Sequence, residues 1–215
     1  MDNDIRFLTE DVTPYLDAAK FELAVSALPL SRAARIRAPR SPLDRARRLA
    51  AEVALRKLLR EAGETYRTLT VAYTDLGKPY FAGRRDLALS FSHSGFLAAA
   101  ALTRAPGGVA PAVGIDLEEV PTGKRAEKYG ALAERFFSAG FLEELRRATP
   151  EERPRVFTRL WCLTEAATKA TGSGALDFAA AETILSTASC RETRQLLDGR
   201  GAEYALALVV TGDVE

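Results

Sequence analysis

The stretch Val113-Gly114-Ile115-Asp116-Leu117-Glu118 places two carboxylates, two residues apart, within an otherwise apolar run. Side chains of a β-strand alternate between its two faces, so Asp116 and Glu118 are expected on one face. The apolar side chains between them would then face a core. Two like charges side by side repel each other, and both ionise most readily when a cation lies between them. The stretch therefore predicts either a site for a hard cation such as Mg²⁺ or a solvated strand end.

Composition bounds the kind of protein that this chain forms. Its 215 residues suit one large domain or two small ones, and a hydrophobic content of 47% is normal for a globular core. The net charge of +1 gives no general indication of nucleic acid or a membrane as partner. Residues 31–60 are an exception, because they hold ten basic and two acidic residues. This basic segment predicts an anionic ligand or an acidic partner.

Targeting signals and cysteines favour a cytoplasmic protein. The acidic start at residues 1–4 does not resemble a secretory signal, and no apolar run is long enough to span a membrane. Cys162 and Cys190 form neither a metal-binding spacing nor a disulfide framework, as is usual in a reducing compartment. The single histidine, His93, excludes a histidine-rich metal site.

Two long helices are predicted over residues 42–62 and 155–171, because apolar residues recur there at helical spacing. In the second helix, Trp161, Glu165 and Lys169 are each four residues apart and form one stripe beside the apolar face. Glu165 and Lys169 are expected either to serve a site or to form an i,i+4 ion pair worth ~0.3–0.5 kcal/mol.

Two polar stretches carry groups suited to phosphate. Gly77-Lys78-Pro79 reads as a turn with a lysine point charge, although most lysines in turns are only solvated. Ser92-His93-Ser94-Gly95 lies between predicted strands at 87–91 and 96–102, and its hydroxyls, imidazole and backbone are donors for a phosphate. The alternative is an ordinary hairpin with a structural histidine. A Ser-His-Asp hydrolase is disfavoured because the chain lacks a Gly-x-Ser-x-Gly nucleophile elbow.

A segment rich in Gly and Pro, residues 104–111, divides the chain into candidate halves at 1–108 and 109–215. Each half combines one long helix with several strands. Further strands are predicted at 69–73, 112–120, 184–186 and 204–211, and shorter helices at 131–137 and 140–148.

The order and combination of these motifs resemble the 4′-phosphopantetheinyl transferases of the surfactin-synthetase-activating type. The resemblance covers about residues 30–175. It rests on four motifs in the family's order and approximate spacing: Gly77-Lys78-Pro79, Phe91-Ser92-His93-Ser94, Gly114-Ile115-Asp116-x-Glu118 and Trp161-x-x-x-Glu165-Ala166-x-x-Lys169-Ala170-x-Gly172. The last two are the most specific. The resemblance implies an α+β fold of two similar halves related by a pseudo-twofold axis, with a coenzyme A site at their interface and the metal site in the carboxy-terminal half.

The resemblance also implies the chemistry. Enzymes of this family, such as holo-acyl-carrier-protein synthase, transfer the 4′-phosphopantetheine arm of coenzyme A to a serine of an apo carrier protein and release 3′,5′-ADP. By match to the family, Asp116, Glu118 and Glu165 would bind Mg²⁺, or Mn²⁺, and Lys169 would contact the phosphates. Asp116, Glu165 and Lys169 would be the catalytic residues. Contacts to coenzyme A would come from Lys78, Pro79, Ser92, His93, Arg47 and Lys169.

The implied partner is an apo acyl, peptidyl or aryl carrier protein, which in this family is acidic around its serine. The basic segment 31–60 and a loop with Lys124, Arg125 and Lys128 offer complementary charge. The family's single-chain form implies a monomer, and no nucleic acid or membrane is expected as partner. The sequence does not identify the carrier or its pathway.

Two positions depart from the family's pattern. Thr164 stands where the family usually has a lysine directly before the helical glutamate, and Phe141 stands about where some members have a carboxylate proposed as general base. Glu143 and Glu144 follow shortly after. The base is therefore left open among Glu165, a water on the metal and these two glutamates.

Three other functions fit parts of the sequence. A coenzyme A-binding paralogue without transfer is suggested by Thr164 and Phe141 alone, and a catalyst repurposed for another phosphoanhydride would share the same scaffold. A nucleic-acid binder is suggested by the basic segment, but the stacking aromatics of single-strand binding are absent from it. The retained carboxylates and lysine favour an active transferase.

Overall fold

The computed structural model describes residues 4–123, 129–173 and 178–212, and it shows the mixed α+β fold expected from the sequence. The amino-terminal part contains β1 (Asp4–Asp11), η1 (Thr13–Leu16), α1 (Ala18–Ser26), α2 (Leu30–Arg37), α3 (Pro42–Glu61), η2 (Tyr66–Thr68), β2 (Val71–Tyr73), β3 (Pro79–Phe81), β4 (Leu87–Ser94) and β5 (Leu97–Arg104). The carboxy-terminal part contains β6 (Val113–Glu119), α4 (Tyr129–Phe136), α5 (Ala139–Arg147), α6 (Arg153–Thr171), α7 (Phe178–Thr187), β7 (Ala188–Leu197) and β8 (Glu203–Thr211). None of the helices described is long and apolar enough to cross a membrane.

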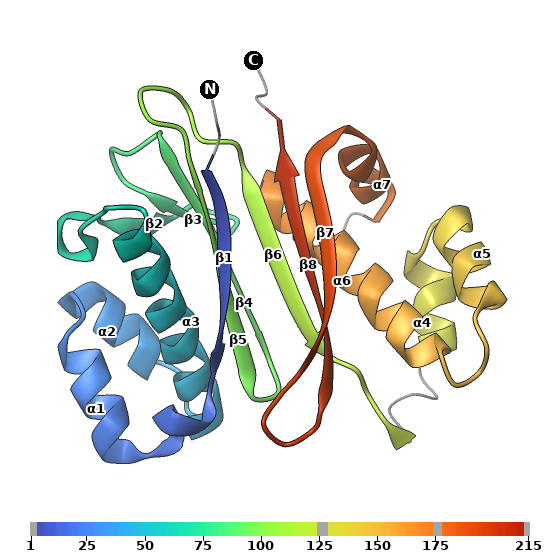
Figure 1. Ribbon diagram of the computed structural model, residues 1–215, viewed down its shortest axis with the longest axis horizontal. Helices are drawn as coiled ribbons and strands as arrows, with labels where there is room; N and C mark the ends of the chain where they lie inside the picture. The colour runs from blue at the N-terminus through green and yellow to red at the C-terminus, as the bar shows by residue number, and fades with distance from the viewer. Residues whose placement is uncertain (1–3, 124–128, 174–177, 213–215) are drawn as a thin grey trace.

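Two three-stranded antiparallel sheets form the centre of the molecule, with strand orders β1-β5-β4 and β6-β8-β7. In each sheet, the first strand along the chain pairs with the last, and the last pairs with the strand that precedes it. Helices of the amino-terminal part lie on one side of the strands, and those of the carboxy-terminal part lie on the other (Figure 1). The two parts thus repeat one order of strands.

The core has three layers, because each sheet packs against the other sheet on one face and against helices on the other. The inner faces pack against each other through residues such as Leu97 on β5 and Ile115 on β6. On the outer faces, α3 packs Leu55 against the first sheet, and α6 packs Ala166 against the second. The apolar side chains of β6 that were predicted to face a core are buried, so this prediction is confirmed.

Helix α6 crosses β6 at Gly114, where the two backbones come very close. A Cβ atom at this position would lie 1.9 Å from the Ala166 carbonyl oxygen and 2.5 Å from the Ala170 nitrogen. Only glycine fits there without moving the helix. The crossing brings the stripe of α6 that carries Glu165 and Lys169 next to the carboxylates of β6.

Some predictions about local structure are wrong. The strand predicted at 87–91 continues through residues 92–94, since the ladder of β4 with β5 reaches the pair Ser94–Leu97. Residues 184–186 lie in α7, and the strand begins only at Ala188. Strand β7 is largely exposed and charged, so it lacks the apolar run that would have predicted it.

Candidate functional site

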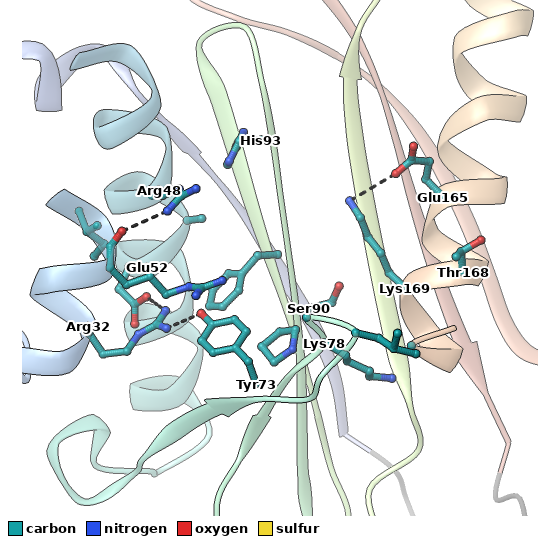
Figure 2. A pocket seen from close by; sticks show the side chains of 18 residues that line it. Arg32, Arg48, Glu52, Tyr73, Lys78, Ser90, His93, Glu165, Thr168 and Lys169 are labelled. Atoms are coloured by element: carbon teal, nitrogen blue, oxygen red, sulfur yellow. Dashed lines mark hydrogen bonds and ion pairs between the residues drawn. The ribbon is translucent and has the colours of Figure 1, made fainter. Parts of the chain in front are cut away.

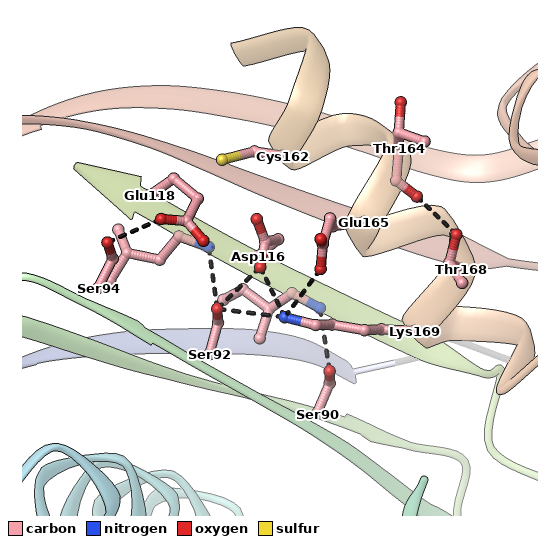
Figure 3. Close-up of polar contacts among 12 residues, drawn as sticks. Ser90, Ser92, Ser94, Asp116, Glu118, Cys162, Thr164, Glu165, Thr168 and Lys169 are labelled. Carbon is pink, nitrogen blue, oxygen red and sulfur yellow. Dashed lines mark hydrogen bonds and ion pairs between the residues drawn. The ribbon is translucent and has the colours of Figure 1, made fainter. Parts of the chain in front are cut away.

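Lys169 of α6 lies among the polar side chains of two strands (Figure 3). Its Nζ is 2.6 Å from Asp116 Oδ1 on β6, 3.2 Å from Ser92 Oγ on β4 and 4.0 Å from Glu165 Oε2 on its own helix. The contact with Asp116 is the shortest, so Lys169 is more than the partner of an i,i+4 pair. The structure therefore brings together Asp116, Glu165 and Lys169, which the sequence places up to 53 residues apart.

Asp116 is buried, with 1% of its surface exposed, so it is not part of a solvated strand end. Its Oδ1 accepts hydrogen bonds from Ser92 and Lys169, whereas its buried Oδ2 has no hydrogen-bond partner among the described residues. The Cys162 thiol lies near Asp116 but donates to the Ala205 carbonyl oxygen at 3.4 Å. A buried carboxylate oxygen without a partner is costly, and it suits a ligand that the site is built to bind.

Crowding of carboxylates shifts the ionisation of this site. Burial and the charge of Asp116 raise the pKa of Glu118 to about 7. The same two causes raise the pKa of Glu165. Partial burial disfavours the Lys169 ammonium, but the charge of Asp116 and the hydrogen bond to it raise the pKa of Lys169 overall. A further cation would favour the ionised form of both glutamates.

The donor set fits a hard divalent cation such as Mg²⁺, which takes carboxylate oxygens as ligands. The unpartnered Oδ2 of Asp116 offers one such ligand, and the glutamates with raised pKa values, Glu118 and Glu165, offer others. Within the described ranges, no three His, Cys, Asp or Glu side chains are already closed into a metal-binding cluster. Lys169 supplies the compensating positive charge in the arrangement seen.

A cavity of about 460 Å³ opens beside Lys169 and Glu165 (Figure 2). Its volume is within the ~300–1,000 Å³ that is usual for small-molecule sites. In Figure 2, Arg32 and Arg48 of the amino-terminal part lie across the cavity from α6. The cations and the imidazole of the lining are Arg32, Arg35, Arg48, Lys78, His93 and Lys169. Such a lining suits an anionic ligand.

A buried network supports the basic wall of this cavity. Arg32 forms an ion pair with Glu52 and donates a hydrogen bond to the Tyr73 hydroxyl. The Tyr66 hydroxyl donates to Glu52 from the other side. The exposed guanidinium of Arg35 lies 3.7 Å from the centroid of the Tyr73 ring, a cation–π contact. The charge of Arg32 is thus balanced inside the protein, while Arg35 presents its charge to solvent.

Lys78, Pro79 and His93 line the cavity. The Nζ of Lys78 donates to the carbonyl oxygen of Ala170 at the end of α6. Its stem packs against Gly172, where a Cβ atom would lie 2.7 Å from Lys78 Cδ. Burial lowers the pKa of Lys78 to about 8. The contacts of these three residues with a ligand stay predictions.

Ser92 and Arg47 lie away from the cavity lining. The Ser92 hydroxyl donates to Asp116 Oδ1 at 2.9 Å, and Arg47 donates to the Gly95 carbonyl oxygen at 2.9 Å. The neighbouring Arg48 lines the cavity instead. Contacts of Ser92 and Arg47 with coenzyme A therefore stay predictions without support from this geometry.

Ser90, Arg32 and Arg35 line the cavity but were missed by sequence reasoning, and Ser94, predicted as a donor to phosphate, donates to Glu118 instead. A signal for the serines exists, because they alternate with the same period of two as the carboxylates of β6. The prediction that the strand ends at residue 91 hides this alternation of the serines. The two arginines carry no signal that separates them from the others of the basic segment.

The two departures from the family pattern lie on packing surfaces. Thr164 is 1% exposed, and its hydroxyl donates to the Leu160 carbonyl oxygen of the same helix. Phe141 packs edge-on against Phe137, with ring centroids 5.8 Å apart. Neither residue belongs to the described lining of the cavity.

Comparisons with known proteins agree with the motifs. Residues 112–209, which include β6, α6 and most of β8, match the family model of the 4′-phosphopantetheinyl transferase superfamily. The curated 4′-phosphopantetheinyl transferase psf-1 of Bacillus pumilus is 33% identical over 133 residues, which are 61% of this chain and 52% of that protein. The match thus spans about half the length of that relative. The recognition drawn from the motifs is confirmed.

Proposed function

Because the chain resembles the 4′-phosphopantetheinyl transferases in its motifs, its family match and its curated relative, we propose that it carries out their reaction. The 4′-phosphopantetheine arm of coenzyme A passes to a serine of an apo carrier protein, and 3′,5′-ADP is released in a Mg²⁺-dependent step. The observation that carries this proposal is the 2.6 Å contact of Lys169 with Asp116, because it joins the β6 and α6 motifs beside a basic cavity.

Asp116, Glu118 and Glu165 are the residues that would hold Mg²⁺. When bound, the cation supplies positive charge for the pyrophosphate of coenzyme A. The ammonium of Lys169 stabilises the negative charge that develops on the leaving group. Phosphoryl transfer depends more on such charge stabilisation and on positioning than on covalent help from the protein.

The 3′-phosphoadenosine end of coenzyme A binds in the basic cavity in this proposal. Arg35, Arg48 and Lys78 offer cationic donors, and His93 offers an imidazole. Phosphate oxygens accept short, charge-assisted hydrogen bonds from groups of this kind. The cavity also borders Glu165 and Lys169, so a ligand bound there can extend its pyrophosphate toward them.

Glu165 is the best supported general base for the serine hydroxyl. It lines the cavity, 4.0 Å from Lys169, within reach of a ligand bound there. Glu143 forms an ion pair with Arg147, and Glu144 forms one with Arg159, on exposed parts of α5 and α6 outside the described lining.

The proposal includes an acidic carrier protein as partner. Helices α2 and α3 span most of the basic segment and offer charge for steering such a partner. Lys124, Arg125 and Lys128, which were predicted to add to this charge, lie outside the described residues.

We also propose that the chain is organised as two similar halves. The shared strand order of the two sheets supports a division at residues 1–108 and 109–215 with a pseudo-twofold axis between the halves. We also propose that the protein acts as a cytoplasmic monomer, with no nucleic acid or membrane as partner.

Intact-mass analysis of a panel of apo acyl, peptidyl and aryl carrier proteins tests the function. With coenzyme A and Mg²⁺, at least one carrier is expected to gain the mass of one phosphopantetheine arm, and its Ser→Ala variant is expected to gain none. If the protein binds coenzyme A but modifies no carrier, the coenzyme A-binding paralogue without transfer is the better description.

The affinity for 3′,5′-ADP is expected to fall as the pH rises above about 8, because Lys78, whose pKa is lowered to about 8, then loses its proton. Loss of one charged hydrogen bond corresponds to roughly a tenfold or greater drop in affinity between pH 7.5 and 9.5. Isothermal titration at several pH values measures it. The Lys78→Arg variant keeps its charge over this range and is expected to show a flat profile. If the affinity for 3′,5′-ADP depends on pH in the same way in the wild type and in Lys78→Arg, Lys78 does not bind the phosphates.

A further inference from the structure

Three serines of β4 stand in one row opposite β6 (Figure 3). The Oγ atoms of Ser90, Ser92 and Ser94 accept hydrogen bonds from backbone N–H groups of β6 at 3.1, 3.2 and 3.1 Å. The donors are Ile115, Leu117 and Glu119. In this way, side-chain oxygens of one sheet satisfy backbone groups of the other, where β4 and β6 have no backbone ladder between them.

Two of these hydroxyls also reach the carboxylates. Ser92 Oγ is 2.9 Å from Asp116 Oδ1, and Ser94 Oγ is 2.8 Å from Glu118 Oε2. A serine hydroxyl has one proton and two lone pairs. Because the backbone N–H groups already donate to these oxygens, the single proton of each hydroxyl is directed to its carboxylate.

Each carboxylate is therefore held through one of its oxygens. For Asp116, the hydrogen bonds from Ser92 and Lys169 occupy Oδ1, and they leave the buried Oδ2 without a partner in the part of the chain that the structure describes. A carboxylate fixed in this way presents its second oxygen in a defined direction. Hydrogen bonds of this kind orient metal ligands and affect metal affinity in proteins generally.

We propose that Ser92 and Ser94 are positioning residues, which orient Asp116 and Glu118 for a divalent cation and do not themselves contact the phosphates of the ligand. This inference rests on the proposed function, because it concerns the cation assigned to the same carboxylates. The position of Ser92 outside the described cavity lining agrees with it.

Ser90 provides a matched control. Its Oγ accepts the Ile115 N–H as the other two serines accept theirs, but it makes no hydrogen bond with Asp116 or Glu118 in the described structure. Ser90→Ala thus removes the contact between the sheets and leaves the orientation of the carboxylates intact. A purely structural role of the row predicts the same effect from all three alanine variants.

Mn²⁺ binding, followed by electron paramagnetic resonance of the free ion, separates these roles. Ser92→Ala and Ser94→Ala are expected to bind Mn²⁺ about 10–100-fold more weakly than the wild type, whereas Ser90→Ala keeps its affinity. Ser94→Thr, which retains the hydroxyl, is expected to restore binding. Without metal, the affinity of Ser92→Ala for 3′,5′-ADP is expected to equal that of the wild type. Circular dichroism confirms that each variant is folded.

Unchanged Mn²⁺ affinity in Ser92→Ala and Ser94→Ala would overturn the inference, and so would an equal loss in Ser90→Ala. A loss of 3′,5′-ADP affinity in Ser92→Ala would show that Ser92 contacts the phosphates, against this inference. A wild-type protein that binds no Mn²⁺ would overturn both the metal site and the inference. Normal Mn²⁺ binding without modification of any carrier would overturn the proposed function alone.

Discussion

Replacing Asp116 with asparagine is expected to slow phosphopantetheine transfer by about 10²–10³-fold, the range seen when one electrostatic contributor to a transition state is removed. Asparagine has nearly the same shape, and its amide oxygen can still accept the hydrogen bond from Ser92. It lacks the charge that would hold Mg²⁺ and that now balances Lys169 at 2.6 Å. Intact-mass measurement of the initial rate at saturating coenzyme A tests this.

Stability separates this loss from unfolding. The Lys169 side chain is 31% exposed and has Glu165 at 4.0 Å, so loss of the Asp116 charge leaves it partly solvated and still near a carboxylate. We therefore expect a circular-dichroism melting curve close to that of the wild type. Glu192→Gln, which breaks a surface ion pair with Arg194 on β7, is the matched control and is expected to leave the rate unchanged. Full activity of Asp116→Asn would show that the charge of Asp116 is not needed for transfer and would contradict its assignment as a metal ligand.

Gly114→Ala is expected to damage both stability and activity. The added Cβ would lie 1.9 Å from the Ala166 carbonyl oxygen and 2.5 Å from the Ala170 nitrogen. Both atoms belong to the backbone of α6, so the helix itself must move. Overpacking of this kind costs roughly 1–3 kcal/mol or somewhat more. At about 2–4 °C per kcal/mol for a chain of this size, we expect a melting temperature lowered by roughly 5–10 °C.

A displaced α6 also separates Lys169 from Asp116, so transfer is expected to fall further than partial unfolding explains. Gly130→Ala is the control, because an added Cβ on this exposed glycine of α4 meets no atom of the described residues within 4 Å. That variant is expected to be as stable as the wild type or slightly more stable, since alanine favours a helix. Wild-type melting and activity of Gly114→Ala would contradict the close crossing of α6 and β6.

The parts of the fold with a strong local pattern were predictable from the sequence. Helices α3 and α6 and strand β6 each have apolar residues at the spacing of their element, and all three are confirmed. Strand β7 and helix α7 were not predictable in this way. β7 is charged and exposed, so no apolar alternation marks it, and it is recognised as a strand only through its pairing with β8.

The site was predictable only in part. Alternation placed Asp116 and Glu118 on one face, and the helical period placed Glu165 and Lys169 in one stripe, but neither pattern contains the contact between them. That contact depends on the glycine at which α6 crosses β6 and on the packing of α6 against the second sheet. The hydrogen bond that Asp116 Oδ1 accepts from Ser92 likewise comes from the other sheet. Such features arise from the tertiary structure, and local sequence patterns do not reveal them.

Anomalous diffraction from crystals of the protein grown with coenzyme A and Mn²⁺ tests the central claim most directly. The account predicts one Mn²⁺ peak bonded to Asp116 Oδ2, with Glu118 and Glu165 beside it. It also predicts the pyrophosphate next to Lys169 and the 3′-phosphoadenosine end in the basic cavity. A Mn²⁺ peak away from these carboxylates, or coenzyme A bound outside the cavity, would contradict it.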